Sequence, residues 1–169
     1  GNHLPVGTDS FLAAGVARKL EERLGSERCL VLPCVPYGQV WSLRETAGTV
    51  DIPDAVLTPY LVQIAMSVYR AGVRKFVFLT AIKAAMREVY AQCDMKVYAF
   101  TYPGAEAVIS RVCTSKRPHK AYFHACEIET SYMLYLCPEQ VDMSKAISQY
   151  PVFPDDFDVT PHRWTEIMA

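Results

Sequence analysis

The stretch from His124 to Glu139, HACEIETSYMLYLCPE, gathers a histidine, carboxylates, thiols and hydroxyls beside a short apolar run. The imidazole of His124 and the carboxylates of Glu127 and Glu129 are hard or borderline donors that suit Zn²⁺, Mn²⁺ or Fe²⁺. One short motif cannot complete a metal site alone. The remaining ligands must therefore come from elsewhere in the chain.

The first ten residues, GNHLPVGTDS, offer a second set of donors. His3 and Asp9 stand six residues apart, just ahead of a helical pattern. An aspartate at the start of a helix is most often a cap or a favourable partner of the helix dipole. The same carboxylate could instead join His124 in a metal site, and the residues alone leave both interpretations open.

The cysteines allow a third kind of chemistry. Cys126 lies between His124 and Glu127, so a cysteine hydrolase with His124 as the base is an alternative to a metal site. The six cysteines form no C-x-x-C pair, and several lie in apolar runs, where cysteine behaves as a small hydrophobic residue. This usage favours a reducing compartment over a disulfide framework.

The apolar periodicity predicts an α/β fold with a mostly parallel sheet and helices on both of its faces. Apolar residues at helical spacing predict helices over residues 10–24, 59–71 and 81–92. Short β-prone runs predict strands over residues 29–35, 75–79 and 96–102. We expect Ser10 or Asp9 to cap the first helix, Gly25 to end it, and Thr58 to cap the second, with Pro59 in its first turn.

Composition narrows the class of partner. The 169 residues suit one domain, and 17 basic against 18 acidic side chains leave a formal net charge of -1. This balance gives no electrostatic footprint for nucleic acid or for an anionic membrane, so we expect a small-molecule substrate. No apolar run approaches the roughly 20 residues of a membrane span, and we expect a cytoplasmic protein.

Several motifs together resemble the creatininase family of metal-dependent amidohydrolases. In order, they are GNHLPVGTDS before a helix, PYG, the pair Gly48–Thr49, GVRKFVFL, and HACEIETSYMLYLCPEQVDM. The resemblance implies a three-layer α/β/α sandwich with a mostly parallel central sheet. It also implies two divalent cations per subunit, Zn²⁺ or Mn²⁺ with Fe²⁺ as a further option, that activate water to cleave a small cyclic amide. Deformylases and keto-inositol hydrolases belong to the same family, and its members are commonly homohexamers.

The resemblance also implies roles for individual residues. Asp9 matches the aspartate that bridges the two metals, and Glu127 matches a position that completes the second metal's ligands. His124 matches a histidine that moves protons on the substrate side, and Glu129 is expected to orient a neighbouring group in catalysis. His3 matches a supporting residue that is not a direct ligand.

The chain also departs from the family pattern. The resemblance implies a Glu-x-His motif before Gly1 and an Asn-Gly-His-Gly loop after FVFL, and this sequence carries neither. We expect a single domain over residues 1–169 that lacks family segments before Gly1, between Thr80 and Ala81, and after Ala169. The alternative is a non-catalytic relative that has lost its metals.

A last departure concerns the substrate. Relatives often place a histidine and an aromatic residue before the Gly-Thr pair, whereas Leu43, Arg44 and Thr46 stand there in this sequence. A guanidinium can bind a carboxylate or several hydroxyls, and a tryptophan ring can stack on a substrate ring. Arg44 and Trp41 are therefore the predicted substrate-binding residues, and creatinine itself is in doubt.

Overall fold

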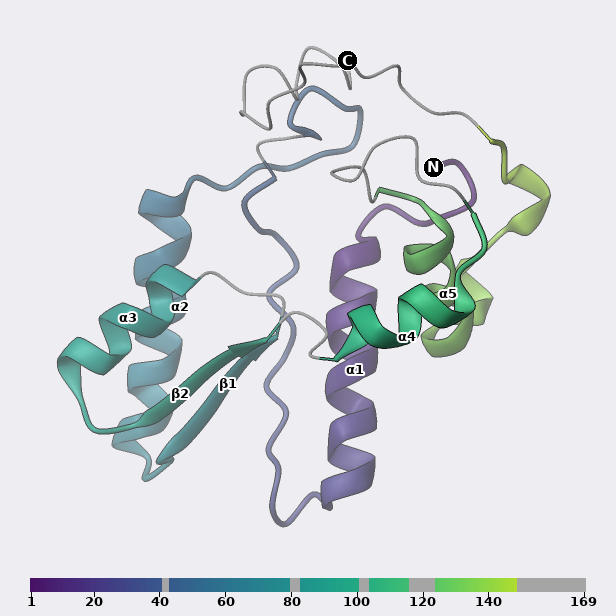
Figure 1. Ribbon diagram of the computed structural model, residues 1–169. Coiled ribbons are helices and arrows are strands. Elements are labelled where there is room, and N and C mark those ends of the chain that lie inside the picture. The colour runs from purple at the N-terminus through teal and green to yellow at the C-terminus, as the bar shows by residue number, and fades with distance from the viewer. Residues whose placement is uncertain (41–42, 80–82, 101–103, 116–123, 149–169) are drawn as a thin grey trace. The chain divides into compact units, whose positions relative to one another are not determined.

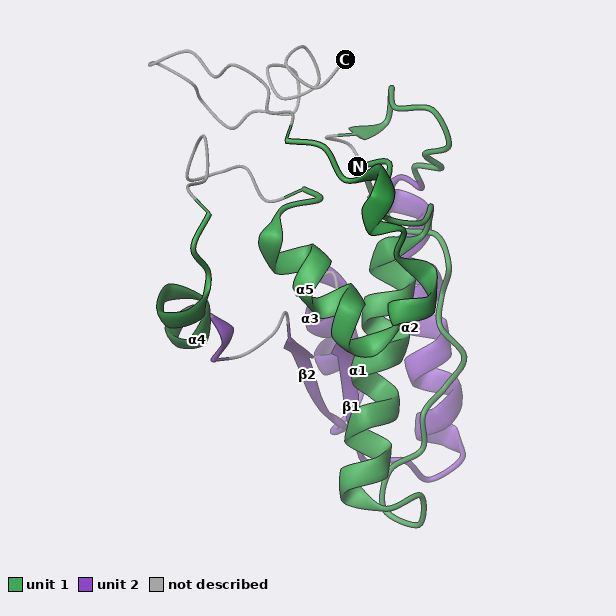
Figure 2. Cartoon of the chain, turned by 90° about the vertical axis from the view of Figure 1, so that its right-hand side faces the viewer, with its two compact units in different colours: residues 1–51, 107–169 green, residues 52–106 purple. Residues whose placement is uncertain are grey.

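The computed structural model describes residues 1–40, 43–79, 83–100, 104–115 and 124–148 (Figure 1). The chain divides into two units, residues 1–51 with 107–169 and residues 52–106 (Figure 2). Within the described residues, no helix combines the length and the apolar character needed to cross a membrane. The elements in chain order are α1 (Thr8–Leu24), α2 (Asp54–Arg70), β1 (Lys75–Leu79), α3 (Lys83–Gln92), β2 (Lys96–Phe100), α4 (Ala105–Val112), α5 (Glu127–Leu136), and the 3₁₀ turns η2 (Pro138–Gln140) and η3 (Met143–Lys145).

The unit of residues 52–106 contains a parallel pair of strands. Strands β1 and β2 pair in register from Lys75 opposite Lys96 to Leu79 opposite Phe100. Side chains alternate between the two faces of a strand, so one face of this pair points into a core that it shares with α2 and α3. The buried residues of that core are Val62, Ala65, Phe78, Ala85, Val89, Met95 and Val97.

These strands confirm two of the sequence predictions. β1 has the predicted bounds, and β2 begins at the predicted residue. Helix α3 is observed from Lys83 to Gln92 within the predicted 81–92. The predicted ends at 81–82 and 101–102, and the proposed family segment between Thr80 and Ala81, lie outside the described residues.

Helix α2 begins earlier than predicted. It starts at Asp54 with Pro53 at the N-cap, so the expectation that Thr58 caps it is wrong. Leu57 and Thr58 are both buried, and Thr58 lies one turn before the buried Val62 on the same side of the helix. Burial of that extra turn offsets the backbone hydrogen bond that Pro59 cannot donate inside the helix.

The predicted strand over residues 29–35 is also wrong. The described backbone there makes no strand pairing, and Leu30 is 74% exposed. Pro33 and Pro36 lack the N–H groups that a strand ladder needs. The segment instead runs along the start of α1, where the Ser10 hydroxyl donates to the Pro36 carbonyl at 3.2 Å.

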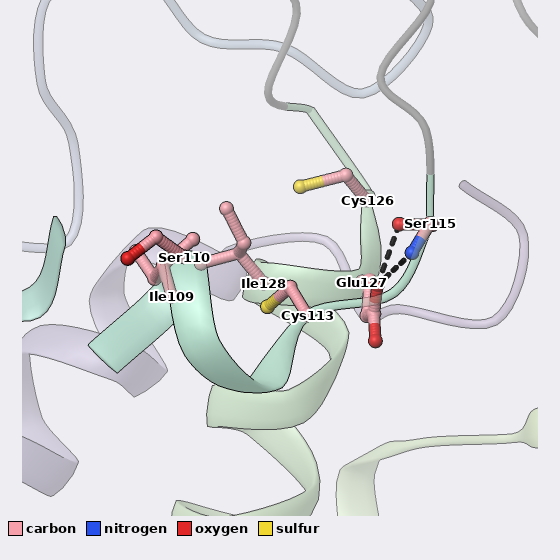
Figure 3. A pocket seen from close by; sticks show the side chains of 7 residues that line it. All are labelled: Ile109, Ser110, Cys113, Ser115, Cys126, Glu127 and Ile128. Carbon is pink, nitrogen blue, oxygen red and sulfur yellow. Dashed lines mark hydrogen bonds between the residues drawn. The ribbon is translucent and has the colours of Figure 1, made fainter. Parts of the chain in front are cut away.

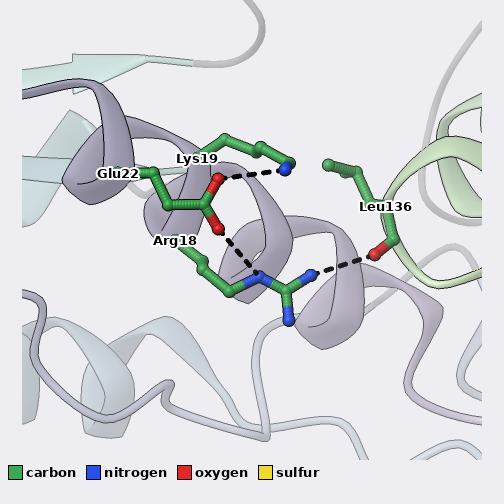
Figure 4. Close-up of polar contacts among 4 residues, drawn as sticks. All are labelled: Arg18, Lys19, Glu22 and Leu136. Atoms are coloured by element: carbon green, nitrogen blue, oxygen red, sulfur yellow. Dashed lines mark hydrogen bonds and ion pairs between the residues drawn. The ribbon is translucent and has the colours of Figure 1, made fainter.

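Helix α1 packs against α5 within the unit of residues 1–51 and 107–169. It follows Gly7, whose φ of 87° is left-handed, and ends at Gly25. The prediction that Gly25 ends this helix is confirmed. The prediction that Ser10 or Asp9 caps its start is wrong, because the N-cap is Gly7 and no side chain caps the helix. Arg18 of α1 donates to the Leu136 carbonyl at the end of α5 at 3.1 Å, while Glu22 accepts from Lys19 at 3.0 Å (Figure 4).

Gly15 lets α1 and α5 approach closely, and enlarging it should destabilise the chain. A Cβ atom at Gly15 would lie 3.0 Å from the Leu136 Cβ. We expect Gly15→Val to lower the free energy of unfolding by about 2 kcal/mol through overpacking. Urea unfolding measures the change. The matched control is Ala14→Val on the exposed side of the same helix, and equal effects of the two substitutions would contradict a close contact at Gly15.

Candidate active site

The start of α1 presents Asp9 in an exposed position. Gly7 turns the chain through its left-handed conformation, and the Thr8 hydroxyl donates to the Pro5 carbonyl at 2.7 Å. Asp9 lies in the first turn of α1, where the helix dipole favours an anion. The Asp9 side chain is exposed and makes no cap hydrogen bond at the helix start. Its carboxylate is therefore available to a ligand.

The turn before α5 holds His124 in place through an unusual backbone. Ala125 adopts a φ of 52°, which an L-residue other than glycine seldom occupies. Its N–H donates to Oε2 of Glu129, the third residue of α5, whose side chain can reach back over the helix start. Such strain persists only where the surroundings fix it, and it is commonly found at functional sites.

The charge of Asp9 influences both His124 and Glu129. Partial burial raises the pKa of Glu129 to about 7, against the lowering effect of the Ala125 N–H and with a further increase from the negative charge of Asp9. Burial lowers the pKa of His124, while Asp9 opposes this shift. A lowered pKa favours the uncharged imidazole of His124 near neutral pH, whereas the carboxyl group of Glu129 can hold or release a proton there.

His3 is buried against α5. Its side chain is buried, and its Nε2 lies 2.8 Å from the Thr130 hydroxyl of α5. The His3 carbonyl accepts from the Asp142 N–H at 3.0 Å. Burial lowers the pKa of the imidazole. The first contact joins the N-terminal segment to α5, and the second joins it to Asp142 before η3. The supporting role of His3 stays a prediction.

Glu127 points to a different neighbour. Its carboxylate accepts from the Thr114 and Ser115 N–H groups and from the Ser115 hydroxyl, and these hydrogen bonds lower its pKa (Figure 3). Successive helical residues turn by about 100°, so Glu127 and Glu129 project about 200° apart around α5. The structure therefore brings Glu129 into electrostatic contact with Asp9 while it directs Glu127 toward the end of α4. Glu127 as a metal ligand stays a prediction.

A small cavity lies beside Glu127. Its volume is about 120 Å³, and both Cys113 and Cys126 line it (Figure 3). Cys126 is buried, with 9% of its surface exposed. The other lining residues are Ile109, Ser110, Ser115, Glu127 and Ile128.

Comparison with known proteins identifies the family. A family model described as creatinine amidohydrolase matches residues 1–169. The chain belongs to the creatininase family. Two solved creatininase structures share its fold, as the sequence predicted. One is titled "Creatininase Mn", with a TM-score of 0.69 and 27% identity, and the other is a tryptophan-to-phenylalanine mutant, with a TM-score of 0.73 and 29% identity. Each alignment covers 96% of this chain and 72% of the other.

Three characterised relatives of this creatininase-family chain are hydrolases with different substrates. It is 28% identical to the creatinine amidohydrolase of Pseudomonas putida over 95% of its own length and 69% of the relative. It is 29% identical to the mycofactocin precursor peptide peptidase of Mycobacterium tuberculosis, over 83% of its own length and 55% of the relative. It is 26% identical to the 3-dehydro-scyllo-inosose hydrolase of Thermotoga maritima, over 89% of its own length and 51% of the relative. The chain thus spans little more than half of the latter two proteins.

The donor chemistry at this creatininase site suits part of a metal shell. Asp9 and Glu129 are carboxylates that repel each other when both are charged, and a cation between them offsets that repulsion. His124 is held in the neutral form that can bind a metal. Among the described residues, no group of three His, Cys, Asp or Glu side chains is arranged to hold an ion. The described residues therefore offer donor types that suit a divalent cation but not a complete set of ligands.

Of the two predicted substrate-binding residues, the structure describes Arg44 and not Trp41. Arg44 is exposed and pairs with its neighbour Glu45 at 3.2 Å. Trp41 lies outside the described residues. Sequence reasoning missed the Ala125 N–H as the partner of Glu129, because no side-chain pattern signals a left-handed alanine. The Thr130 hydroxyl, in contrast, stands within the HACEIETS motif and could have been found there.

Proposed function

We propose that this chain is a metal-dependent hydrolase that cleaves a small cyclic amide, or a related C–N or C–C bond, with water. The observation that carries the proposal is the exposed carboxylate of Asp9 at the start of α1, whose charge influences both His124 and Glu129 near the start of α5. Membership of the creatininase family and the hydrolase relatives support it. The structural neighbour named creatininase Mn supports a divalent metal, and two ions per subunit are proposed by family analogy.

Each residue of the group has a distinct proposed role. Asp9 would hold the cation. The family resemblance would make Glu127 a second ligand, but its side chain would first have to leave its hydrogen bonds to Thr114 and Ser115. A bound divalent ion would lower the pKa of a coordinated water and polarise the substrate carbonyl. His124, an uncharged imidazole in a half-buried position, accepts a proton and passes it to the leaving nitrogen. Glu129 keeps the turn at Ala125 in place and balances the charge around His124.

The remaining partners follow from the sequence and the family. Arg44 and Trp41 are proposed to bind the substrate, which is a small molecule and not a nucleic acid. The chain is proposed to act in the cytoplasm and to assemble into a homo-oligomer, a hexamer by family analogy. Exposed apolar side chains on α5 and beyond it, Leu134, Tyr135 and Ile147, would suit such an assembly.

A substrate panel with and without metal tests the proposed function. The panel contains creatinine and small lactams, formamides, short peptides and keto-inositols. We expect hydrolysis of a cyclic amide, loss of that activity after chelation, and recovery with Mn²⁺ or Zn²⁺. Undiminished activity in the chelated protein would refute metal dependence. A metal-loaded chain that hydrolyses no substrate class would instead favour a non-catalytic relative.

A further inference from the structure

The Glu127 carboxylate receives four hydrogen bonds from one short segment. The Thr114 N–H lies 3.2 Å from Oε1 and 3.0 Å from Oε2, and the N–H and hydroxyl of Ser115 lie 2.8 and 2.6 Å from Oε2. Donors that converge on a charged acceptor make stronger hydrogen bonds than neutral pairs do. Glu127 therefore ties the chain just beyond α4 to the first turn of α5.

The two glutamates of this turn act on opposite sides of α5. Glu129 reaches back to the Ala125 N–H and interacts with Asp9, whereas Glu127 reaches residues 114–115. A ligand role for Glu127 beside Asp9 would require the side chain to leave all four hydrogen bonds. The Thr114 and Ser115 N–H groups would then lose their charged acceptor. Both residues are exposed, so water can replace it, and the cost is the loss of charge-assisted hydrogen bonds.

We propose that Glu127 is a positioning residue that clamps residues 113–115 to α5 and thereby fixes the turn that carries His124. The catalytic consequence rests on the proposed function, whereas the clamp itself does not. Ser115 and Glu127 also form part of the wall of the cavity that Cys113 and Cys126 line. Release of the clamp should therefore make the half-buried Cys113 thiol and the buried Cys126 thiol more accessible.

The test compares Glu127→Ala and Glu127→Gln with the exposed control Glu139→Gln. Four quantities are measured in the full chain: Mn²⁺ bound per chain after dialysis against MnCl₂, amide hydrogen exchange at Thr114 and Ser115, the rate of thiol labelling at Cys113 and Cys126, and turnover. We expect Glu127→Ala to bind as much Mn²⁺ as the wild type. We expect exchange and labelling about tenfold or more faster, because the local opening is no longer opposed, together with reduced turnover.

The amide of Glu127→Gln tests the clamp in a gentler way. Its Oε1 can still accept hydrogen bonds while its NH₂ group cannot, so exchange and labelling should lie between wild type and Glu127→Ala. Ser115→Ala removes one donor from the other side and should act in the same direction. If Glu127→Ala lost Mn²⁺ while exchange at residues 114–115 stayed slow, Glu127 would be a ligand and the clamp would be refuted. If no variant or wild type hydrolysed a substrate, only the proposed function would fail, since exchange and labelling still decide the clamp.

Discussion

Replacing Asp9 by alanine should abolish metal binding and hydrolysis together. Asp9 is an exposed carboxylate at the positive end of α1, and its charge influences both His124 and Glu129. Groups that only orient a metal ligand already change affinity or activity by about 10–100-fold, so loss of a ligand should cost at least about 100-fold. Metal analysis after dialysis and the rate on the best substrate of the panel measure the two effects.

The controls separate a ligand from a general acid–base group. Asp54→Asn changes an aspartate in the first turn of α2 and should leave metal content and rate unchanged. His124→Ala should keep the metal but lose about 10²–10⁴-fold in turnover, the usual contribution of a positioned proton carrier. Cys126→Ser should change little, whereas a cysteine hydrolase would lose its activity. An Asp9→Ala protein that keeps both metal and activity would show that the site is assigned wrongly.

Local patterns predicted the elements that are stabilised within their own unit. Strand β1 has a parallel partner close in sequence and α2 and α3 to cover it, so its apolar run matches its bounds. The run at residues 29–35 has equal β propensity but no strand beside it in the described part of the chain. A strand exists only as part of a ladder, and a single sequence does not reveal whether a partner is present.

Helix starts were harder to predict because a side-chain cap is one of several ways in which a chain can begin a helix. Thr58 followed by Pro59 has the residues of a helix start, yet burial of Leu57 carries α2 one turn further back. Gly7 replaces the side-chain cap expected from Asp9 or Ser10 at α1, because a left-handed glycine turns the chain there. At α2 burial overrode a local preference, whereas at α1 the left-handed conformation of one glycine took the place of a side-chain cap.

The sequence predicted which residues make up the site motif, but not the direction in which their side chains point. HACEIETS supplies the donors, and its resemblance to the creatininase family is confirmed by the family match. The direction of each carboxylate depends on the conformation of the motif. In an extended chain Glu127 and Glu129 would share a face, whereas in α5 they project to opposite sides. The beginning of α5 at Glu127 thus decides which glutamate interacts with Asp9, and no residue type in the motif states where that helix begins.

Replacing Glu129 by glutamine should stabilise the metal-free chain at alkaline pH. Partial burial and Asp9 raise the pKa of Glu129 from 4.5 to about 7. Between these values the native state keeps the proton that the unfolded state loses, so stability falls as pH rises through about 7. The pKa difference corresponds to about 3 kcal/mol, and partial exposure to solvent reduces the expected effect to about 2 kcal/mol. Glutamine has no proton to lose and can still accept from the Ala125 N–H.

Urea unfolding in EDTA at several pH values measures the difference between Glu129→Gln and wild type. We expect the two proteins to be nearly equal in stability below about pH 4.5, and the variant to gain up to about 2 kcal/mol by pH 8. Glu139→Gln, at an exposed position in η2, should show no such pH-dependent gain. A Glu129→Gln protein that is less stable than wild type at pH 8 would mean that the native state uses the charged carboxylate even without a metal. In that case folding would not raise the pKa of Glu129, and its side chain would be a charged carboxylate in the folded chain at neutral pH.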